Sequence, residues 1–350
     1  MKFRFLTSTP REIARGSGTY VGISVLAGAL RGLGHTVDFA SPTRHFPIYT
    51  VERLWFNRGL RASTGHDCTV GFDMDGYRIA GAPGVRHIAS LKGVIADEVR
   101  FESGLTRLTM GVQARCERLH VLRAAGVMVS SRYSALCAQR FYGLERIPAV
   151  VPEAIDLGAW RGHLGGSGAE ETARFTVLSV GRFYRRKRVD LLLGAAAALR
   201  QAIPDLEVRI VGNGPCNGAW RALAARLRLG KTVTWLGDIS RSQLAAEYNR
   251  AHVFCLPSVQ EGFGIVLLEA MAAGKPIVAA RAAAIPEVAP HATLVERESG
   301  EALAAGLLEL YESSAARAAQ CAKGLAWVER FDAPLVAGAF VEAVVAGLGE

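Results

Sequence analysis

The sequence of 350 residues lacks an apolar run of the roughly 18 to 20 residues that a membrane span requires. Its start, Met1-Lys2-Phe3-Arg4-Phe5-Leu6, has no apolar stretch long enough for a signal peptide, so we expect a protein that is not exported. The six cysteines are far apart and form no C-x-x-C pair, in a chain too large to need disulfide staples. We therefore predict reduced, mostly buried thiols.

Length and composition together predict two packed domains. The chain exceeds the size at which one hydrophobic core usually stops growing, about 250 to 300 residues. Half of its residues are apolar, so each half of the chain can bury a core of its own.

Positive charge is concentrated in the first half of the chain. Residues 1–155 hold 20 Lys and Arg against 12 Asp and Glu, a net charge of +8, whereas residues 156–350 hold 21 against 20, a net charge of +1. A basic half suits nucleic acid, an anionic membrane surface or an acidic small substrate, and charge alone does not choose among them. A solvated, arginine-rich surface explains the excess equally well.

The first half begins with a βαβ pattern. Residues 3–7 predict a strand, 20–32 a helix and 35–40 a second strand. The glycine loop from Arg15 to Thr19 precedes the helix, where free N–H groups and the helix dipole favour an anion, so Gly18 is a candidate phosphate-binding residue. A simple turn is the commoner origin of such a loop.

A glycine-rich stretch from Pro152 to Thr172 has neither helical nor strand periodicity. We therefore predict a linker at residues 156–172. It separates an N-terminal domain, residues 1–155, from a C-terminal domain, residues 173–330.

The second half repeats short strands and helices with turn residues between them. Strands are expected at residues 175–180, 206–211, 232–236, 253–256 and 276–280, with helices between them. This alternation predicts a parallel, doubly wound α/β sheet that is covered on both faces. Ligands of such sheets bind beyond the carboxyl ends of the strands, so the loops that follow the strands are the candidate site.

Three of these loops carry unusual residues. The first has Gly181 and Arg182 followed by a basic cluster that ends at Lys187, and the second has the tight turn from Gly212 to Gly214. A glycine loop that enters a helix, with Arg and Lys held nearby, can bind a diphosphate without a metal ion.

The third loop contains two glutamates, Glu261 before a predicted helix and Glu269 inside it. Both carboxylates could accept hydrogen bonds from the hydroxyls of one extended ligand, such as a sugar and a ribose on either side of a diphosphate. Taken alone, the spacing is more simply a solvated helix face.

Several short sequence motifs, in consecutive order along the chain, favour the ligand-binding interpretation of this spacing. Residues 175–286 resemble the donor domain of the retaining glycosyltransferases grouped as family four. The matching pieces are Val180-Gly181-Arg182 with Lys187, Ile210 to Pro215, Val233 to Gly237, Pro257 to Gly274, and Ile285-Pro286-Glu287. The resemblance implies a GT-B fold, in which two Rossmann-like, doubly wound parallel-sheet domains face a cleft. It also implies that a last helix, about residues 331–350, packs back on the N-terminal domain.

The resemblance further implies roles for individual residues. Arg182 and Lys187 would bind the donor diphosphate and Glu261 the transferred sugar, and these three are the candidate catalytic residues. Glu269 would hold the ribose. The remaining candidate donor-binding residues, through backbone or loop shape, are Gly181, Gly212, Gly214, Gly237, Asp238, Gly262, Phe263, Gly264 and Ile265, with Gly18 from the first domain.

The match is weaker in the first half. Many relatives have a histidine in the cleft after a buried strand, but this sequence has Lys92 there, and His87 is more simply a structural residue of the strand. Asp73 and Asp75 form an Asp-x-Asp that follows a predicted strand, and with Lys92 they are candidates to meet the acceptor rather than a metal. Asp97, Glu98 and Glu102 are expected as solvated charges on a helix.

We therefore expect a retaining glycosyltransferase that uses a nucleotide-diphosphate sugar, built on UDP, GDP or another nucleotide, with no cofactor, metal or nucleic acid. The acceptor is expected to be anionic or lipid-linked, as in polysaccharide or lipopolysaccharide assembly, and the chain to be cytoplasmic, with peripheral contact at the inner face of a membrane. A related nucleotide-sugar epimerase or hydrolase and a non-catalytic nucleotide-sugar-binding subunit are the alternatives. Release of nucleotide only when an acceptor is present separates a transferase from both.

Overall fold

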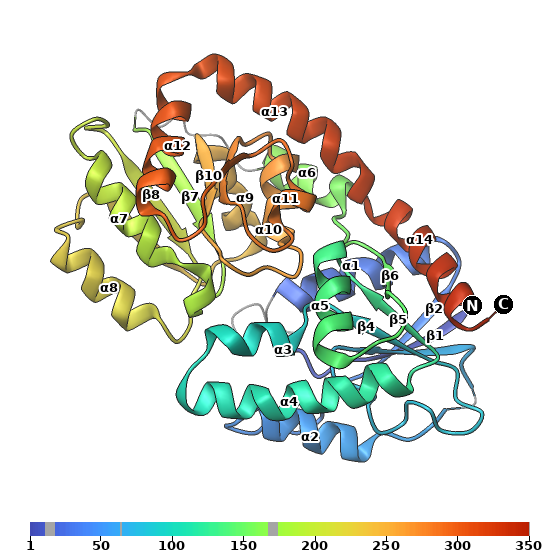
Figure 1. Cartoon of the computed structure of the whole chain (residues 1–350). Helices are drawn as coiled ribbons and strands as arrows, with labels where there is room; N and C mark the ends of the chain where they lie inside the picture. The colour runs from blue at the N-terminus through green and yellow to red at the C-terminus, as the bar shows by residue number, and fades with distance from the viewer. Residues whose placement is uncertain (11–17, 64, 167–173, 350) are drawn as a thin grey trace. The chain divides into compact units, whose positions relative to one another are not determined.

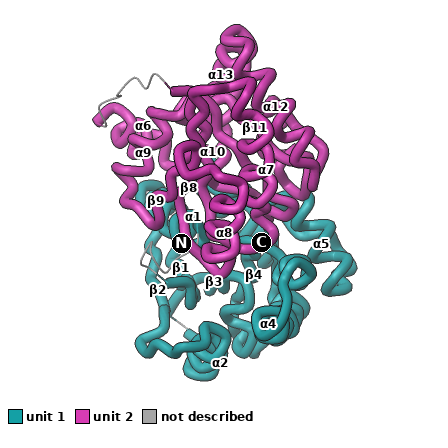
Figure 2. Tube along the Cα trace, turned by 90° about the vertical axis from the view of Figure 1, so that its left-hand side faces the viewer, with its two compact units in different colours: residues 1–154, 333–350 teal, residues 155–332 magenta. Residues whose placement is uncertain are grey.

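The computed structural model describes residues 1–10, 18–63, 65–166 and 174–349. It contains two compact units (Figure 2). Unit 1 holds residues 1–154 and 333–350, and unit 2 holds residues 155–332. The loop from Arg15 to Ser17, which precedes the candidate residue Gly18, lies outside the described residues.

Unit 1 is built on a parallel sheet of six strands in the order β2-β1-β3-β4-β5-β6. Its strands are β1 (Lys2–Leu6), β2 (Thr36–Ala40), β3 (Cys68–Phe72), β4 (His87–Leu91), β5 (Gly126–Val129) and β6 (Ala149–Val150). Its helices of four residues or more are α1 (Gly18–Gly32), α2 (Tyr49–Gly59), α3 (Ile95–Glu98), α4 (Gly104–Arg123), α5 (Arg132–Tyr142) and α14 (Ala333–Gly347).

Both faces of this sheet are buried, because successive strand residues place their side chains on opposite faces. Ile88 packs in a core with α1 and α14, whereas its neighbour Ala89 packs in a second core with α4 and α5. Phe3, Phe5 and Phe340 form edge-on aromatic contacts in the first core, which joins the C-terminal helix α14 to the strands of unit 1.

Unit 2 repeats this architecture of strands and helices (Figure 1). Its sheet is again parallel, with the strand order β12-β11-β10-β7-β8-β9. Its strands are β7 (Thr176–Val180), β8 (Glu207–Val211), β9 (Val233–Gly237), β10 (Val253–Leu256), β11 (Ile277–Ala280) and β12 (Thr293–Val295). Its helices are α6 (Leu157–Gly166), α7 (Val189–Leu199), α8 (Asn217–Arg226), α9 (Arg241–Arg250), α10 (Ile265–Ala272), α11 (Ile285–Val288), α12 (Gly300–Glu312) and α13 (Ser314–Val328). The predicted class, two doubly wound parallel α/β domains, is confirmed.

Each sheet reverses its direction of growth at one point. In unit 2 the chain runs outward from β7 through β8 and β9, then crosses to β10 on the other side of β7. In unit 1 the same reversal separates β1 from β3. The loops on either side of such a reversal leave a crevice at the carboxyl edge, which is where ligands of these folds bind.

The predicted linker at residues 156–172 is wrong for its first part. Residues 157–166 form helix α6, which belongs to unit 2. Asp156 accepts a hydrogen bond from the Ala159 N–H at 2.8 Å, and Leu157 and Trp160 are buried. The sequence did not predict this helix because it is rich in glycine and only two of its side chains, those of Leu157 and Trp160, are buried. Residues 167–173 lie outside the described part of the chain.

The acidic residues expected to be solvated are not all solvated. The side chain of Asp97 is fully buried and accepts hydrogen bonds from the Tyr133 hydroxyl at 2.7 Å and from Arg100 at 3.0 Å. Glu102 is also buried. The expectation is wrong for these two because the segment forms a short turn packed against α4 and α5, where a hydroxyl and a guanidinium replace water. The cysteines are free, as predicted, and Cys68, Cys116, Cys137 and Cys255 are buried.

A buried histidine pair joins β4 to α4. His87 Nε2 lies 2.7 Å from His120 Nε2, and His120 Nδ1 lies 2.5 Å from the carbonyl oxygen of Asp73. Because that carbonyl only accepts, His120 donates from Nδ1. Burial disfavours a charge on either ring, so both are neutral, and His120 Nε2 accepts from His87 Nε2. A Cβ at Gly76 would lie 2.7 Å from His87, and one at Gly71 would lie 2.8 Å from His120, so these glycines make room for the rings.

We expect acid to destabilise unit 1 through this pair. Burial lowers the pKa of His120 to about 4 and, together with the charge of His120, lowers the pKa of His87 well below its usual value. Because both pKa values are lowered in the folded state, the contribution of the neutral pair to the free energy of unfolding is complete above about pH 6.5. This contribution is lost as the pH falls toward 4. In urea unfolding at stepped pH, each histidine should contribute about 1.4 kcal/mol per pH unit to the slope, measured as the difference between the wild type and a variant that lacks it. His120→Gln should flatten this slope and the exposed control His163→Gln should keep it; equal slopes in all three proteins would contradict the assignment.

Candidate functional site

The loops that follow β7, β8 and β9 are joined by backbone hydrogen bonds at the carboxyl edge of the unit 2 sheet. The Gly181 N–H donates to the carbonyl of Val211 at 3.1 Å, and the Gly212 N–H donates to the carbonyl of Gly237 at 2.7 Å. Gly212 has a φ of 120°, and a Cβ there would lie 2.0 Å from the Gly181 carbonyl oxygen. Only glycine permits this close approach, so the turn residues that the sequence singled out fix the shape of the edge.

The basic turn after β7 is held against the loop after β10. Its residues Arg185–Lys187 form a single 3₁₀ turn, and the carbonyl of Arg186 accepts a hydrogen bond from the Val259 N–H at 2.9 Å. These two loops flank the reversal between β7 and β10, so the crevice of unit 2 lies between them.

An ion pair between Lys187 and Glu261 spans this crevice. Lys187 Nζ lies 2.6 Å and 2.7 Å from the two carboxylate oxygens of Glu261. The Glu261 side chain is buried, which by itself raises the pKa of its carboxyl, but the charges of Lys187 and Arg186 outweigh burial and lower that pKa below its usual value. Glu261 is therefore a carboxylate at neutral pH, ready to accept hydrogen bonds from hydroxyl groups.

Positive charge exceeds negative charge around this pair. Residues 185–188 are all basic, and Arg182 lies on the same loop with its side chain 29% exposed. Arg182 Nη1 lies 3.9 Å from Asp238 Oδ1, in the loop that follows β9. The cationic side chains of the loop after β7 therefore suit an anion at this edge of the sheet.

Glu269 is fixed from three sides. Its carboxylate accepts hydrogen bonds from Arg241 and, at 3.2 Å, from the hydroxyl of Tyr248, and its backbone carbonyl accepts one from Trp160 Nε1 at 3.1 Å. The Arg241 guanidinium lies over the Trp160 ring at 4.4 Å. Helix α6, which the sequence suggested to be linker, thus supports a candidate site residue.

The remaining loop residues prepare the start of α10. Gly264 has a φ of 96° and precedes the first helical residue, Ile265, so the backbone turns sharply into the helix. Phe263 is buried, with its ring 5.6 Å from that of Phe331. Its side chain anchors the loop, which leaves a ligand role for Gly262 and Phe263 to the backbone.

The unit 1 candidates are less open than the sequence suggested. Asp75 is fully buried, and its carboxylate accepts from Ser8 Oγ at 2.6 Å, from Asn57 Nδ2 at 2.9 Å and from Arg53 at 3.3 Å. Protein donors thus enclose the carboxylate of Asp75, and its acceptor role stays a prediction. Asp73 is 15% exposed, and burial raises the pKa of its carboxyl to about 6.

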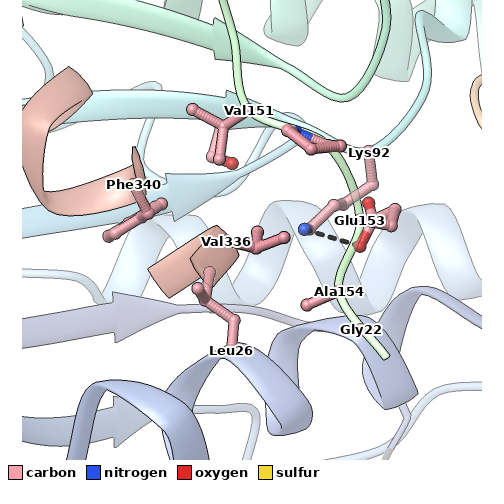
Figure 3. Close-up of a pocket in the computed structure, with 10 residues that line it drawn as sticks. Gly22, Leu26, Lys92, Val151, Glu153, Ala154, Val336 and Phe340 are labelled. Atoms are coloured by element: carbon pink, nitrogen blue, oxygen red, sulfur yellow. Dashed lines mark hydrogen bonds and ion pairs between the residues drawn. The ribbon is translucent and has the colours of Figure 1, made fainter. Parts of the chain in front are cut away.

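Lys92 lies at the carboxyl end of β4 and pairs with Glu153, with Lys92 Nζ 3.0 Å from Glu153 Oε2 (Figure 3). The pair lines a small cavity of unit 1 together with apolar side chains that include Leu26, Val336 and Phe340. Gly18 is the exposed first residue of α1.

Sequence reasoning missed two contributors to this edge, Arg241 and Trp160. Arg241 is the first residue of α9, where an arginine after a Ser240 cap carries no distinguishing pattern. Trp160 is recognisable only once α6 is known to be helical. An unusual residue in a supposed linker, a tryptophan among glycines, was the available signal.

The chain is similar to known glycosyltransferases in sequence and in fold. Residues 166–324 match the family described as Glycosyl transferases group 1. A D-inositol 3-phosphate glycosyltransferase from Pseudarthrobacter chlorophenolicus is 33% identical over 41% of this chain and 36% of its own length. A GDP-mannose-dependent alpha-(1-6)-phosphatidylinositol monomannoside mannosyltransferase from Mycobacterium tuberculosis is 32% identical over 44% of this chain and 43% of its own length. The matched part thus spans less than half of either curated relative.

The fold likeness extends over nearly the whole chain. The structure of a sucrose-phosphate synthase from Thermosynechococcus elongatus superimposes with a TM-score of 0.80, covering 99% of each chain at 20% identity. This likeness shows that the fold is of the GT-B type, as the sequence resemblance implied.

Gly212→Ala tests the shape of the edge. The added Cβ would collide with the Gly181 carbonyl, so we expect the free energy of unfolding to fall by about 2 kcal/mol or more. Gly194→Ala is the matched control, because this exposed glycine inside α7 has nothing within 4 Å of an added Cβ and should gain about 0.5 to 1 kcal/mol. Chemical denaturation measures both; equal effects of the two substitutions would contradict the steric argument.

Proposed function

We propose that this chain transfers a sugar from a nucleotide-diphosphate sugar to an anionic, lipid-linked acceptor, because residues 166–324 match the family described as Glycosyl transferases group 1. The observation that carries the proposal is the Lys187–Glu261 pair at the reversal point of the unit 2 sheet, with Arg182 on the same loop as Lys187. This arrangement places a carboxylate, which can accept hydrogen bonds from sugar hydroxyls, close to cationic side chains.

The cationic groups suit the charge that the reaction creates. When the bond between the anomeric carbon and the leaving oxygen breaks, negative charge develops on the β-phosphate of the nucleotide. Arg182, Lys187 and the N-terminus of α10 would stabilise this charge more in the transition state than in the bound donor, which accelerates transfer. A guanidinium and an ammonium perform this task without a metal ion.

The two glutamates would divide recognition of the donor between them. Glu261 would accept hydrogen bonds from hydroxyls of the transferred sugar, and Glu269 from the ribose. Both carboxylates are held by protein donors, so their oxygens are fixed in position before the donor binds. We further propose that the anomeric configuration is retained, which nuclear magnetic resonance of the product tests directly.

The acceptor proposal depends on charge and on the relatives. Residues 1–155 carry a net charge of +8, and the names of the two curated relatives specify an inositol phosphate and a phosphatidylinositol mannoside as acceptors. An anionic acceptor at a membrane face would be concentrated near such a basic unit. No helix within the described ranges is long and apolar enough to cross a bilayer.

The experiment that tests the proposal measures release of UDP or GDP from a panel of nucleotide sugars, with and without an acceptor extract. Release only in the presence of acceptor supports a transferase. Equal release without acceptor would indicate a hydrolase, and no release from any donor that raises the melting temperature would indicate a binding subunit.

Glu261→Ala should leave unit 2 folded and remove most of the transfer activity, because it deletes the carboxylate that faces the sugar hydroxyls. We expect a loss of at least about 100-fold in kcat/KM, the scale on which a positioned charged group acts. The exposed Glu309→Ala is the control and should keep full activity. Near-normal turnover in a folded Glu261→Ala protein would overturn the site.

Activity should survive chelation by EDTA. Arg182 and Lys187 would neutralise the diphosphate, and Asp75 of the Asp-x-Asp is committed to Ser8 and Asn57. Turnover of dialysed protein with EDTA, compared with turnover in added Mg²⁺ or Mn²⁺, is the measurement. Loss of activity that either metal restores would contradict the proposed diphosphate site.

A further inference from the structure

Helix α4 has mostly polar side chains on its buried side and leucines on its exposed side, the reverse of the usual arrangement. Its buried side holds the polar Gln113, Glu117 and His120 beside Cys116 and Val121, whereas its leucines Leu105 and Leu108 are 66% and 68% exposed. Leu119 and Leu122 are also exposed, at 38% and 46%. A helix that only covered a sheet would place leucine inward and polar residues outward.

The exposed leucines share one side of the helix. Leu108, Arg115, Leu119 and Leu122 follow the spacing i, i+7, i+11 and i+14, which keeps side chains on one helix face. We name the α4 outer face as Leu105, Leu108, Leu119 and Leu122 with Arg115 and Arg118, all of which are exposed. Arg107 and Arg123 are exposed on the same helix.

This helix exposes no acidic side chain. Its one acid, Glu117, is buried, where it accepts hydrogen bonds from the Tyr142 hydroxyl and, at 2.8 Å, from the Ile95 N–H. The α4 outer face is therefore cationic and apolar along its length.

The neighbouring helix α2 has the same composition. Val51 and Trp55 are each 42% exposed and Arg58 is exposed, while its one acid, Glu52, is buried. The two helices pack side by side through a buried hydrogen bond of 3.0 Å from Arg53 to Gln113 (Figure 1). Both helices of this layer thus expose apolar and basic side chains and no acid.

We propose that the α4 outer face docks unit 1 on an anionic membrane surface. The leucines would enter the boundary between headgroups and acyl chains, and the arginines would pair with lipid phosphates, as in helices that lie in the plane of a bilayer. Charge complementarity favours this partner over two others. A second copy of the same face would be repelled, because the face carries arginines and no acids. Nucleic acid would bind the arginines but would leave the leucines without an apolar contact. The 20 residues of α4 form a helix about 30 Å long, which would lie flat on the surface.

This inference extends the proposed function, since it names the surface through which the enzyme would reach a lipid-linked acceptor. It does not depend on catalysis. Binding to vesicles and binding of nucleotide sugar are separate measurements, so either proposal can fail alone.

The test is cosedimentation with vesicles of phosphatidylglycerol and phosphatidylcholine, compared with phosphatidylcholine alone. We expect binding to the anionic vesicles at about 50 mM salt, weaker binding at about 500 mM, and none to the neutral vesicles. Arg115→Gln with Arg118→Gln should weaken binding about 25-fold, at about fivefold for each arginine. Leu108→Ser with Leu119→Ser should weaken it at least tenfold as well, through lost apolar burial.

Matched controls keep this test specific. Leu136→Ser with Leu335→Ser removes two leucines of unit 1 that are 58% and 62% exposed on other helices, and Arg226→Gln with Arg297→Gln removes two exposed arginines of unit 2. Both control proteins should bind like the wild type, and all variants should keep the wild-type melting temperature. Failure of the wild type to bind anionic vesicles, binding unchanged in the α4 variants, or conversion of a wild-type dimer to a monomer by those variants would each overturn the proposal.

Discussion

The buried ion pair between Lys187 and Glu261 joins the two loops that flank the reversal of the unit 2 sheet. Removing either partner would leave a charge in a place where water does not reach it well, which is more costly than losing an exposed pair. Its position follows from the strand order, since loops after β7 and β10 become neighbours only because the chain crosses over between β9 and β10. The topology thus brings together two residues that are far apart in the sequence.

Glycine geometry supports this arrangement from the other side of β7. The close approach of Gly212 to Gly181 draws the loop after β8 against the loop that carries Arg182, so the cationic residues are held by backbone as well as by side chains. Trp160 of α6 does the same for Glu269 by contacting both its carbonyl and its partner Arg241. A segment outside the βα repeat is therefore needed to fix the edge of the sheet.

The sequence was most informative where each element is short and ends in turn residues. Strands β7 to β11 lie within a few residues of their predicted bounds, because glycine and proline punctuate them and apolar runs fill them. It was least informative for α2 and α4, which were not predicted, since polar residues outnumber apolar ones on their buried sides and the apolar pattern is weak. The environment of Asp75 could not be predicted either, because its partners lie far from it in the sequence: Ser8 follows β1, and Arg53 and Asn57 lie on α2.

The reversed helix α4 follows from what it covers. Helix α4 packs on polar partners: His120 meets His87 at the start of β4, and Gln113 meets Arg53 of α2. Each partner needs a hydrogen bond that an apolar helix face could not supply. Polar residues are thereby required on the inner side, but no contact among the described residues of unit 1 requires leucine on the outer side. Lysine there would form helix about as well and would be more soluble. The leucines of the α4 outer face, with arginines and without acids, are therefore best explained by a contact outside the chain.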